Sequence, residues 1–227
     1  MSSLAKSCTL IVFDVDGTLL DANIVDNDCF GRAFQEETGV VLTAPLWEQF
    51  KEVTAQAIVH QALGNDWPDI ESVKARVKDS FLSKLRESYD QDPALIRGFE
   101  SASGLMSHLK ASPDFVVAIA TGCWRETAQF KLNAAGFDVL DVPFASASDC
   151  YGRAEIISLA VERAGGSLDR AVYVGDGVWD LRATQQLGIP FIGVGRKIEA
   201  LRKAGAQYTL ENLNEADLVE ILKQIRN

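Results

Sequence analysis

Short, continuous apolar runs recur along the chain, and each is followed by a stretch with helical spacing. The runs cover residues 9–13, 115–120, 171–174 and 191–194, with a weaker one at 207–210. Uninterrupted apolar runs of this length, rich in β-branched residues, are typical of strands buried on both faces of a parallel sheet. Helical patterns lie between them at 101–110, 125–135, 154–164, 181–187 and 216–225. This alternation predicts an α/β fold with a doubly wound, Rossmann-like parallel sheet.

The segment after the first run interrupts this alternation. Residues 22–92 contain no convincing strand pattern, whereas the stretches 24–37, 46–63 and 70–89 show helical spacing. In the last stretch, apolar residues four positions apart form a stripe along one helix face, at Val73, Val77, Phe81 and Leu85. The sequence therefore predicts an α/β core of residues 1–20 and 97–227, with an all-helical domain of residues 21–96 inserted into it.

Composition narrows the range of partners. The 227 residues include 22 Lys and Arg against 32 Asp and Glu, a net charge of −10, and no run of basic residues. An acidic chain of this kind is not expected to bind nucleic acid or an anionic membrane. The four cysteines are widely separated and form no C-x-x-C pair, so neither a zinc site nor a disulfide framework is expected. With no signal-like apolar stretch near residue 1, we expect a cytoplasmic protein. We further expect it to be a monomer or a homodimer.

Four carboxylates follow two of the predicted strands. Asp14 and Asp16 come directly after the first run, and Asp176 and Asp180 follow the run at 171–174. The carboxyl ends of parallel strands meet at one edge of the sheet, where open α/β sheets bind ligands. Carboxylates brought together repel each other unless a cation compensates, and oxygen ligands suit a hard cation such as magnesium. The sequence therefore predicts a Mg²⁺ site at this edge.

Two further segments offer groups that suit an anion. Thr121 and Gly122 end the run at 115–120 and precede a helical pattern, so a hydroxyl and free backbone N–H groups meet there. Arg153 opens a later helix, where a cation opposes the helix dipole. Beside four acids and a bound anion, Arg153 would compensate charge.

Taken in order, these motifs resemble those of the haloacid dehalogenase-like hydrolases. The matching segments are D-V-D-G-T at 14–18, A-T-G at 120–122, a basic residue at 153 and G-D-x-x-x-D at 175–180. The helical insertion after the first motif is similar to the cap of the phosphoglycolate phosphatase-like branch. Arg153-Ala154 departs from the family pattern, which more often has Lys followed by Pro.

The resemblance implies a role for each matching residue. Asp14 would be the nucleophile that becomes an aspartyl phosphate, and Asp16 would be the general acid and then the base. Thr121, Gly122 and Arg153 would bind the phosphoryl group. Magnesium would be held by four groups: Asp14, the backbone carbonyl of Asp16, Asp176 and, through water, Asp180.

The implied activity is a magnesium-dependent phosphatase that acts on a small phosphorylated metabolite. A carboxylate at Asp16 favours phosphoryl transfer over dehalogenation, because a halide leaves without a proton. Two alternatives stay open: a sugar-phosphate phosphomutase of the same fold, and a non-catalytic binding protein. The inserted helices offer several candidates for substrate contact, and the sequence favours none of them: Asp21, Arg32, Trp47, Lys51 and His60.

Overall fold

A six-stranded parallel sheet forms the centre of the molecule. The computed structural model describes residues 8–42 and 50–226, and its strands follow the order β5-β4-β1-β6-β7-β8. The strands are β1 (Thr9–Phe13), β4 (Phe115–Thr121), β5 (Phe144–Ser146), β6 (Ala171–Gly175), β7 (Phe191–Val194) and β8 (Tyr208–Leu210). In the middle of the sheet, Ile11 pairs in register with Val117 of β4 and Val172 of β6. The predicted doubly wound α/β fold is thus confirmed.

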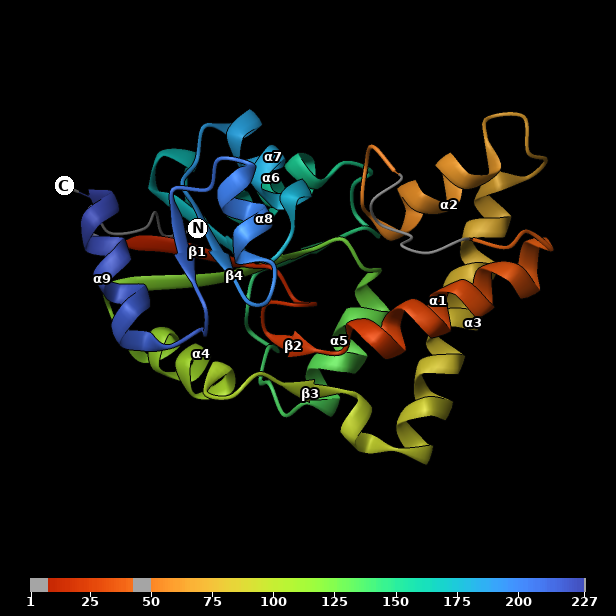
Figure 1. Cartoon of the computed structure of the whole chain (residues 1–227), viewed down its shortest axis with the longest axis horizontal. Coiled ribbons are helices and arrows are strands. Elements are labelled where there is room, and N and C mark those ends of the chain that lie inside the picture. Colours follow the sequence, from red (N-terminus) through yellow and green to blue (C-terminus); the bar gives the residue numbers. More distant parts are fainter. Residues whose placement is uncertain (1–7, 43–49, 227) are drawn as a thin grey trace.

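Both faces of the sheet are buried, as the apolar runs require. Along β1, Ile11 and Phe13 belong to one hydrophobic cluster, while Leu10 and Val12 belong to the cluster on the opposite face, because successive side chains alternate. The first face is covered by α4 (Ala102–Ala111), α5 (Arg125–Ala134) and α9 (Glu215–Arg226). The second is covered by α6 (Arg153–Arg163), α7 (Val178–Leu187) and α8 (Ile198–Lys203) (Figure 1).

Three helices form a separate layer beyond the carboxyl ends of the strands (Figure 1). They are α1 (Asn23–Thr38), α2 (Ala55–Leu63) and α3 (Ile70–Gln91). The chain leaves and re-enters the core side by side, because β2 (Leu20–Asp21) pairs antiparallel with β3 (Arg97–Gly98). The stripe predicted on α3 is buried along its whole length.

Some element boundaries differ from the prediction. The stretch 46–63 is not one helix, because residues 50–54 are non-helical and α2 begins only after Thr54, whose side chain accepts a hydrogen bond from Ala57 N. Residues 43–49 lie outside the described part of the chain. Strand β5 and helix α8 were not predicted, since a three-residue strand and a six-residue helix are too short to show a period.

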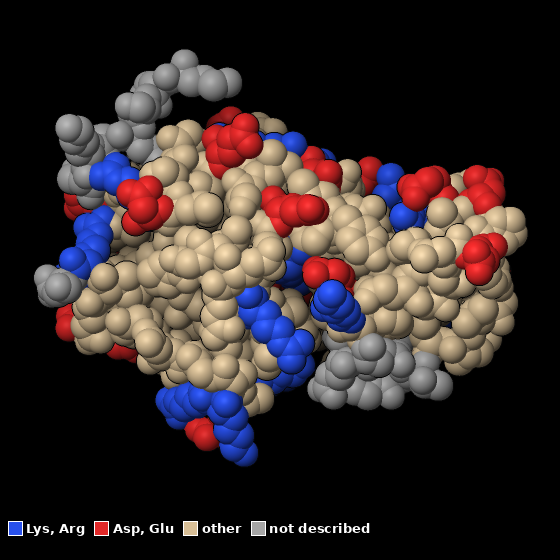
Figure 2. Space-filling view, turned by 90° about the horizontal axis from the view of Figure 1, so that it is seen from above, with Lys and Arg blue, Asp and Glu red and all other residues tan. Residues whose placement is uncertain are grey.

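Charged side chains are unevenly placed on the face shown in Figure 2. Several basic side chains gather in the lower half of the view, acidic side chains lie mainly in the upper half, and large areas between them are uncharged. Within the described residues, no helix combines the length and apolar character that crossing a bilayer requires.

Candidate active site

A cavity of about 270 Å³ lies between the strand ends and the three-helix layer. Its floor is made by residues of the core that follow β1, β4 and β6: Asp14, Asp16, Thr121, Gly122, Cys123, Asp176 and Trp179. Arg153 and Lys197 complete this side. Apart from Asp180, all the predicted site residues line the cavity, and Asp180 lies directly beneath it beside Arg153. Because the carboxyl ends of parallel strands meet at one edge of the sheet, side chains up to 166 positions apart in sequence, from Asp14 to Asp180, lie close together.

Asp14 is almost fully buried and is held from two sides. Its Oδ1 accepts a hydrogen bond from Arg153 Nη1 at 3.1 Å, and its Oδ2 lies 3.5 Å from the Thr18 hydroxyl. Arg153 Nη1 also lies 3.4 Å from Asp180 Oδ1, and Nη2 donates to the carbonyl of Val53. These contacts explain a cation at the first position of α6, since its side chain reaches back to the carboxylates and not to the helix end.

Asp14, Asp176 and Asp180 form a cluster, which we call the three-aspartate cluster. Each contributes a carboxylate oxygen that lies within 4.8 Å of those of the other two, and all three residues are buried. Asp180 is the most fixed, because it accepts hydrogen bonds from Gly177 N at 3.1 Å and from the Tyr173 hydroxyl at 3.3 Å. Asp176 forms no hydrogen bond or ion pair with any other described residue, although it is only 7% exposed.

The electrostatics of this cluster call for a cation. Burial, followed by repulsion from Asp180, raises the pKa of Asp14 well above its usual value. Burial and Asp180 likewise raise the pKa of Asp176 to about 7. Arg153 lowers the pKa values of all three members, and Lys197 lowers that of Asp176 more than Arg153 does, so two cations face three carboxylates. Three convergent oxygen ligands with an unpartnered buried carboxylate fit a hard divalent cation such as Mg²⁺.

Two glycines allow the close approach of these groups. Gly17 has a φ of +83°, and a Cβ there would lie 2.1 Å from Asp176 Oδ2. A Cβ at Gly122 would lie 2.6 Å from Arg153 Nη2 and 2.8 Å from the carbonyl of Val53. Beside Gly122, the buried hydroxyl of Thr121 accepts a hydrogen bond from Cys123 N at 3.2 Å.

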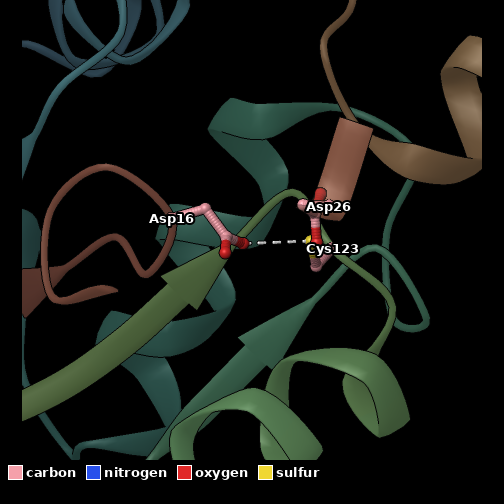
Figure 3. Close-up of side chains that lie close together, drawn as sticks. All are labelled: Asp16, Asp26 and Cys123. Carbon is pink, nitrogen blue, oxygen red and sulfur yellow. Dashed lines mark hydrogen bonds between the residues drawn. The ribbon is translucent and has the colours of Figure 1, made fainter. Parts of the chain in front are cut away.

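The Asp16 side chain belongs to a different group. Its Oδ1 accepts a hydrogen bond from Lys131 Nζ at 2.7 Å, and Lys131 Nζ also donates to Asp26 on α1. We call Asp16 and Asp26, joined by Lys131, the lysine-bridged pair. Cys123 Sγ lies 3.1 Å from Asp16 Oδ2 (Figure 3). The prediction missed Lys131 and Asp26, because in sequence each is one charged residue on an amphipathic helix.

Each charge in the lysine-bridged pair has a partner of opposite sign. Burial alone would lower the pKa of Lys131, but Asp16 and Asp26 outweigh it and raise that pKa well above its usual value. Burial raises the pKa of Asp26 to about 6, and Lys131 opposes the rise. Burial and the charge of Asp16 raise the pKa of the Cys123 thiol, which therefore keeps its proton and can donate it to Asp16.

The roof of the cavity comes from residues that the sequence did not predict to line a site. Asn23, Asp26, Asn27 and Phe30 lie on α1, Phe81 lies on α3, and Val53 and Ala55 lie at the start of α2. Phe30 packs edge-to-face on Phe81 with ring centroids 5.5 Å apart. Of these two rings, the sequence predicted only Phe81, as part of a buried helix face.

Four of the five candidates for substrate contact are described by the structure, and they are not on this roof. Asp21 pairs with Arg97 and Arg196, Arg32 pairs with Asp28, and His60 contacts the Tyr151 hydroxyl. Lys51 is exposed, and none of these four residues lines the cavity. Trp47 lies outside the described residues. The sequence favoured none of these candidates, because polar character does not show which helix face turns toward the core.

Comparison with known proteins identifies the family of the chain. Residues 11–194 match the haloacid dehalogenase-like hydrolase family. The chain belongs to this family. Among its relatives in the haloacid dehalogenase-like family, it is 24% identical to the pyrophosphatase PpaX of Bacillus velezensis, over 92% of this chain and 95% of that protein.

Solved structures share the fold. A hydrolase from Pseudomonas syringae superposes with a TM-score of 0.76 at 20% identity, over 96% of this chain and 99% of that one. The β-phosphoglucomutase of Clostridium difficile gives the same TM-score at 15% identity, with the same coverage. Identities this low show a common architecture, namely the α/β core with helices above the strand ends.

Proposed function

We propose that this protein is a magnesium-dependent phosphatase that hydrolyses a small phosphorylated metabolite through an aspartyl phosphate on Asp14. The observation that carries the proposal is the placement of Asp14. Its carboxylate lies at the end of β1, at the floor of a cavity, within hydrogen-bond distance of Arg153 and within 4.8 Å of two further carboxylates. Family membership and similarity to a pyrophosphatase support phosphoryl transfer as the reaction.

The division of the chain follows from this proposal. Residues 1–20 and 97–227 would be the catalytic core, and residues 21–96 the cap that closes the cavity. The antiparallel β2–β3 pair supports this division, because both connections between the parts pass through it.

In the first step, an Asp14 oxygen attacks phosphorus and the bond from phosphorus to the leaving oxygen breaks. Asp16 donates a proton to that oxygen, so that an alcohol and not an alkoxide departs. Arg153 and the Thr121–Gly122 segment would bind the phosphoryl oxygens and stabilise the charge that builds up on them.

In the second step, water attacks the phosphorus of the aspartyl phosphate. Asp16 takes a proton from that water, the bond from phosphorus to Asp14 breaks, and inorganic phosphate leaves. A bound Mg²⁺ would supply Lewis-acid charge stabilisation, held by Asp14, Asp176, the backbone carbonyl of Asp16 and, through water, Asp180. The unpartnered carboxylate of Asp176 supports this set of ligands.

A panel of phosphate compounds tests the proposal. Release of inorganic phosphate would be measured from p-nitrophenyl phosphate, inorganic pyrophosphate, phosphoglycolate and several sugar phosphates, with Mg²⁺ or with excess EDTA. We expect turnover of at least one compound with Mg²⁺ and none with EDTA. Conversion of a sugar phosphate into its isomer without phosphate release would indicate a mutase, and failure of every compound would indicate a binding protein.

A further inference from the structure

The buried lysine of α5 is the feature that the mechanism above leaves unused. Lys131 is 0% exposed, although most lysines of a soluble protein lie at the surface. Its ammonium group has three N–H donors and three acceptors within reach: Asp16 Oδ1 at 2.7 Å, Asp26 Oδ1, and Cys123 Sγ at 3.4 Å. The lysine is therefore fully coordinated, and its partners line the cavity: Asp16 and Cys123 on the floor, and Asp26 on the roof.

Folding alone gives little reason for this arrangement. Burying an ammonium and a carboxylate costs several kcal/mol per ion, and an apolar pair of similar size often stabilises a protein as well or better. Lys131 and Asp26 could satisfy each other without a third charge. That Lys131 also binds Asp16 indicates a use for the contact at Asp16.

The contacts fix the orientation of the Asp16 carboxyl group. Lys131 holds one oxygen, and the Cys123 thiol donates to the other at 3.1 Å (Figure 3). The Asp16 side chain is still 16% exposed, and it lines the cavity with Asp14. A carboxyl group bound on both oxygens cannot rotate freely, yet it stays open to a ligand in the cavity.

We propose that Lys131, anchored by Asp26 on α1, is a positioning residue that holds the Asp16 carboxyl group toward the reacting oxygen. This inference rests on the proposed function, in which Asp16 moves a proton in both steps. Proton transfer needs hydrogen-bond distance, and a displacement of about 1 Å in an active site can lower the rate by roughly 10²-fold. Because Asp26 belongs to the inserted helices, the same contact joins them to Asp16.

The test compares two leaving groups of similar shape. Phenyl phosphate releases a more basic oxygen than p-nitrophenyl phosphate and so depends more on a proton donor. We expect Lys131→Met to lower the single-turnover rate of phenyl phosphate by roughly 10²-fold, and that of p-nitrophenyl phosphate by a few-fold at most. Intact-protein mass spectrometry can monitor hydrolysis of the phosphoenzyme. In Lys131→Met the rate of this hydrolysis should fall by about the same factor as the single-turnover rate with phenyl phosphate. Lys78→Met removes a more exposed lysine, paired with Glu126 on α5, and should leave all these rates unchanged.

A double variant separates positioning from stability. Lys131→Met leaves Asp26 buried without its cation, which lowers the stability of the folded protein. Combining it with Asp26→Leu removes both charges, so that no unpaired buried charge remains outside Asp16. We expect the double variant to regain thermal stability and to keep the selective loss with phenyl phosphate.

Asp16→Asn, measured alone and together with Lys131→Met, tells the two proposals apart. If Lys131 acts through Asp16, its replacement in the Asp16→Asn background should cause no further loss. Equal losses for both leaving groups, additive losses in the combined variant, or a faster reaction of Lys131→Met would overturn the inference on Lys131. An Asp16→Asn variant that turns over both substrates at wild-type rates would instead overturn the proposed role of Asp16, and with it the inference.

Discussion

Two clusters of carboxylates lie at the cavity, and they differ in how the repulsion between their negative charges is compensated. The three-aspartate cluster gathers three buried carboxylates around one arginine, and Asp176 has no ion-pair partner among the described residues. The lysine-bridged pair places its cation between its two carboxylates, so that both are in contact with it. In the first group Arg153 contacts two of the three carboxylates and leaves Asp176 without an ion-pair partner, whereas in the second Lys131 contacts both carboxylates.

The difference in ion pairing indicates which of the two groups should bind a metal ion. Asp16, Asp26 and Cys123 also bring three ligand atoms within 4.8 Å of one another, as the three-aspartate cluster does. By ligand distance alone, either group could hold an ion. Lys131 contacts all three of those residues, so a cation already occupies the second group. The ion pair with Lys131 would thus keep the carboxyl group of Asp16, which transfers the proton, out of the Mg²⁺ site.

The largest effect is expected from replacing Asp14, the proposed nucleophile in the three-aspartate cluster. Asp14→Asn should lower turnover by at least about 10³-fold with every substrate, because a neutral amide is a poor nucleophile and no neighbouring group replaces it. Asp16→Asn should be selective for poor leaving groups, as argued above. Steady-state rates with phenyl and p-nitrophenyl phosphate, with circular dichroism as the fold control, measure both. Near-wild-type turnover by Asp14→Asn would place the nucleophile elsewhere.

How much the sequence could predict differs between these two groups. Asp14 and Asp176 directly follow apolar strands, so that topology alone brings them together, and Asp180 lies in the first turn of the helix after the second of these strands. Arg153 was predicted from its unfavourable place at a helix start. The lysine-bridged pair has no such signal: Lys131 and Asp26 lie within helices, and only tertiary packing shows that both side chains turn inward.

The same limit holds for the fold. The long apolar strands and the interrupted α/β pattern were predictable from periodicity, and so was the buried stripe of α3. The start of α2 was not, because Thr54 caps the helix within a stretch whose apolar spacing continues on both sides. Phe30 and Phe81 were predictable as core residues, but not as the wall of the cavity.

A second prediction asks whether the two groups bind metal independently. Mg²⁺ that binds only the folded protein at about 100 times its dissociation constant adds about 2.7 kcal/mol of stability. For a chain of this size this corresponds to a rise in Tm of about 5–10 °C. Asp176→Asn should abolish the rise, whereas Lys131→Met combined with Asp26→Leu should keep it. Thermal melts with and without Mg²⁺, against an EDTA reference, decide the matter. Loss of the rise in both variants would show that the groups act as one site.

A third prediction concerns the pH dependence of stability in EDTA. The pKa of Asp176 is about 7 in the folded protein, well above that of an exposed aspartate, because of burial and Asp180. Between these two values the folded state binds more protons than the unfolded state, so the free energy of unfolding falls as pH rises. The contribution of Asp176 to the free energy of unfolding is lost progressively from about pH 4 to about pH 7, by no more than about 1.4 kcal/mol per pH unit.

Asp176→Asn removes this loss and also relieves Asp14 and Asp180 of a neighbouring charge. The Tm of the variant in EDTA should therefore rise relative to that of wild type as pH increases from 5 to 8, by about 2–4 °C for each kcal/mol. Asp66→Asn, which removes an exposed carboxylate on the inserted segment, controls for the loss of one negative charge. Excess Mg²⁺ should reverse the order of stability at pH 8, since the wild-type cluster then holds its cation and the variant does not. A Tm difference that stays constant from pH 5 to pH 8 would mean that Asp176 is already compensated by the chain, and the contrast between the two groups would disappear.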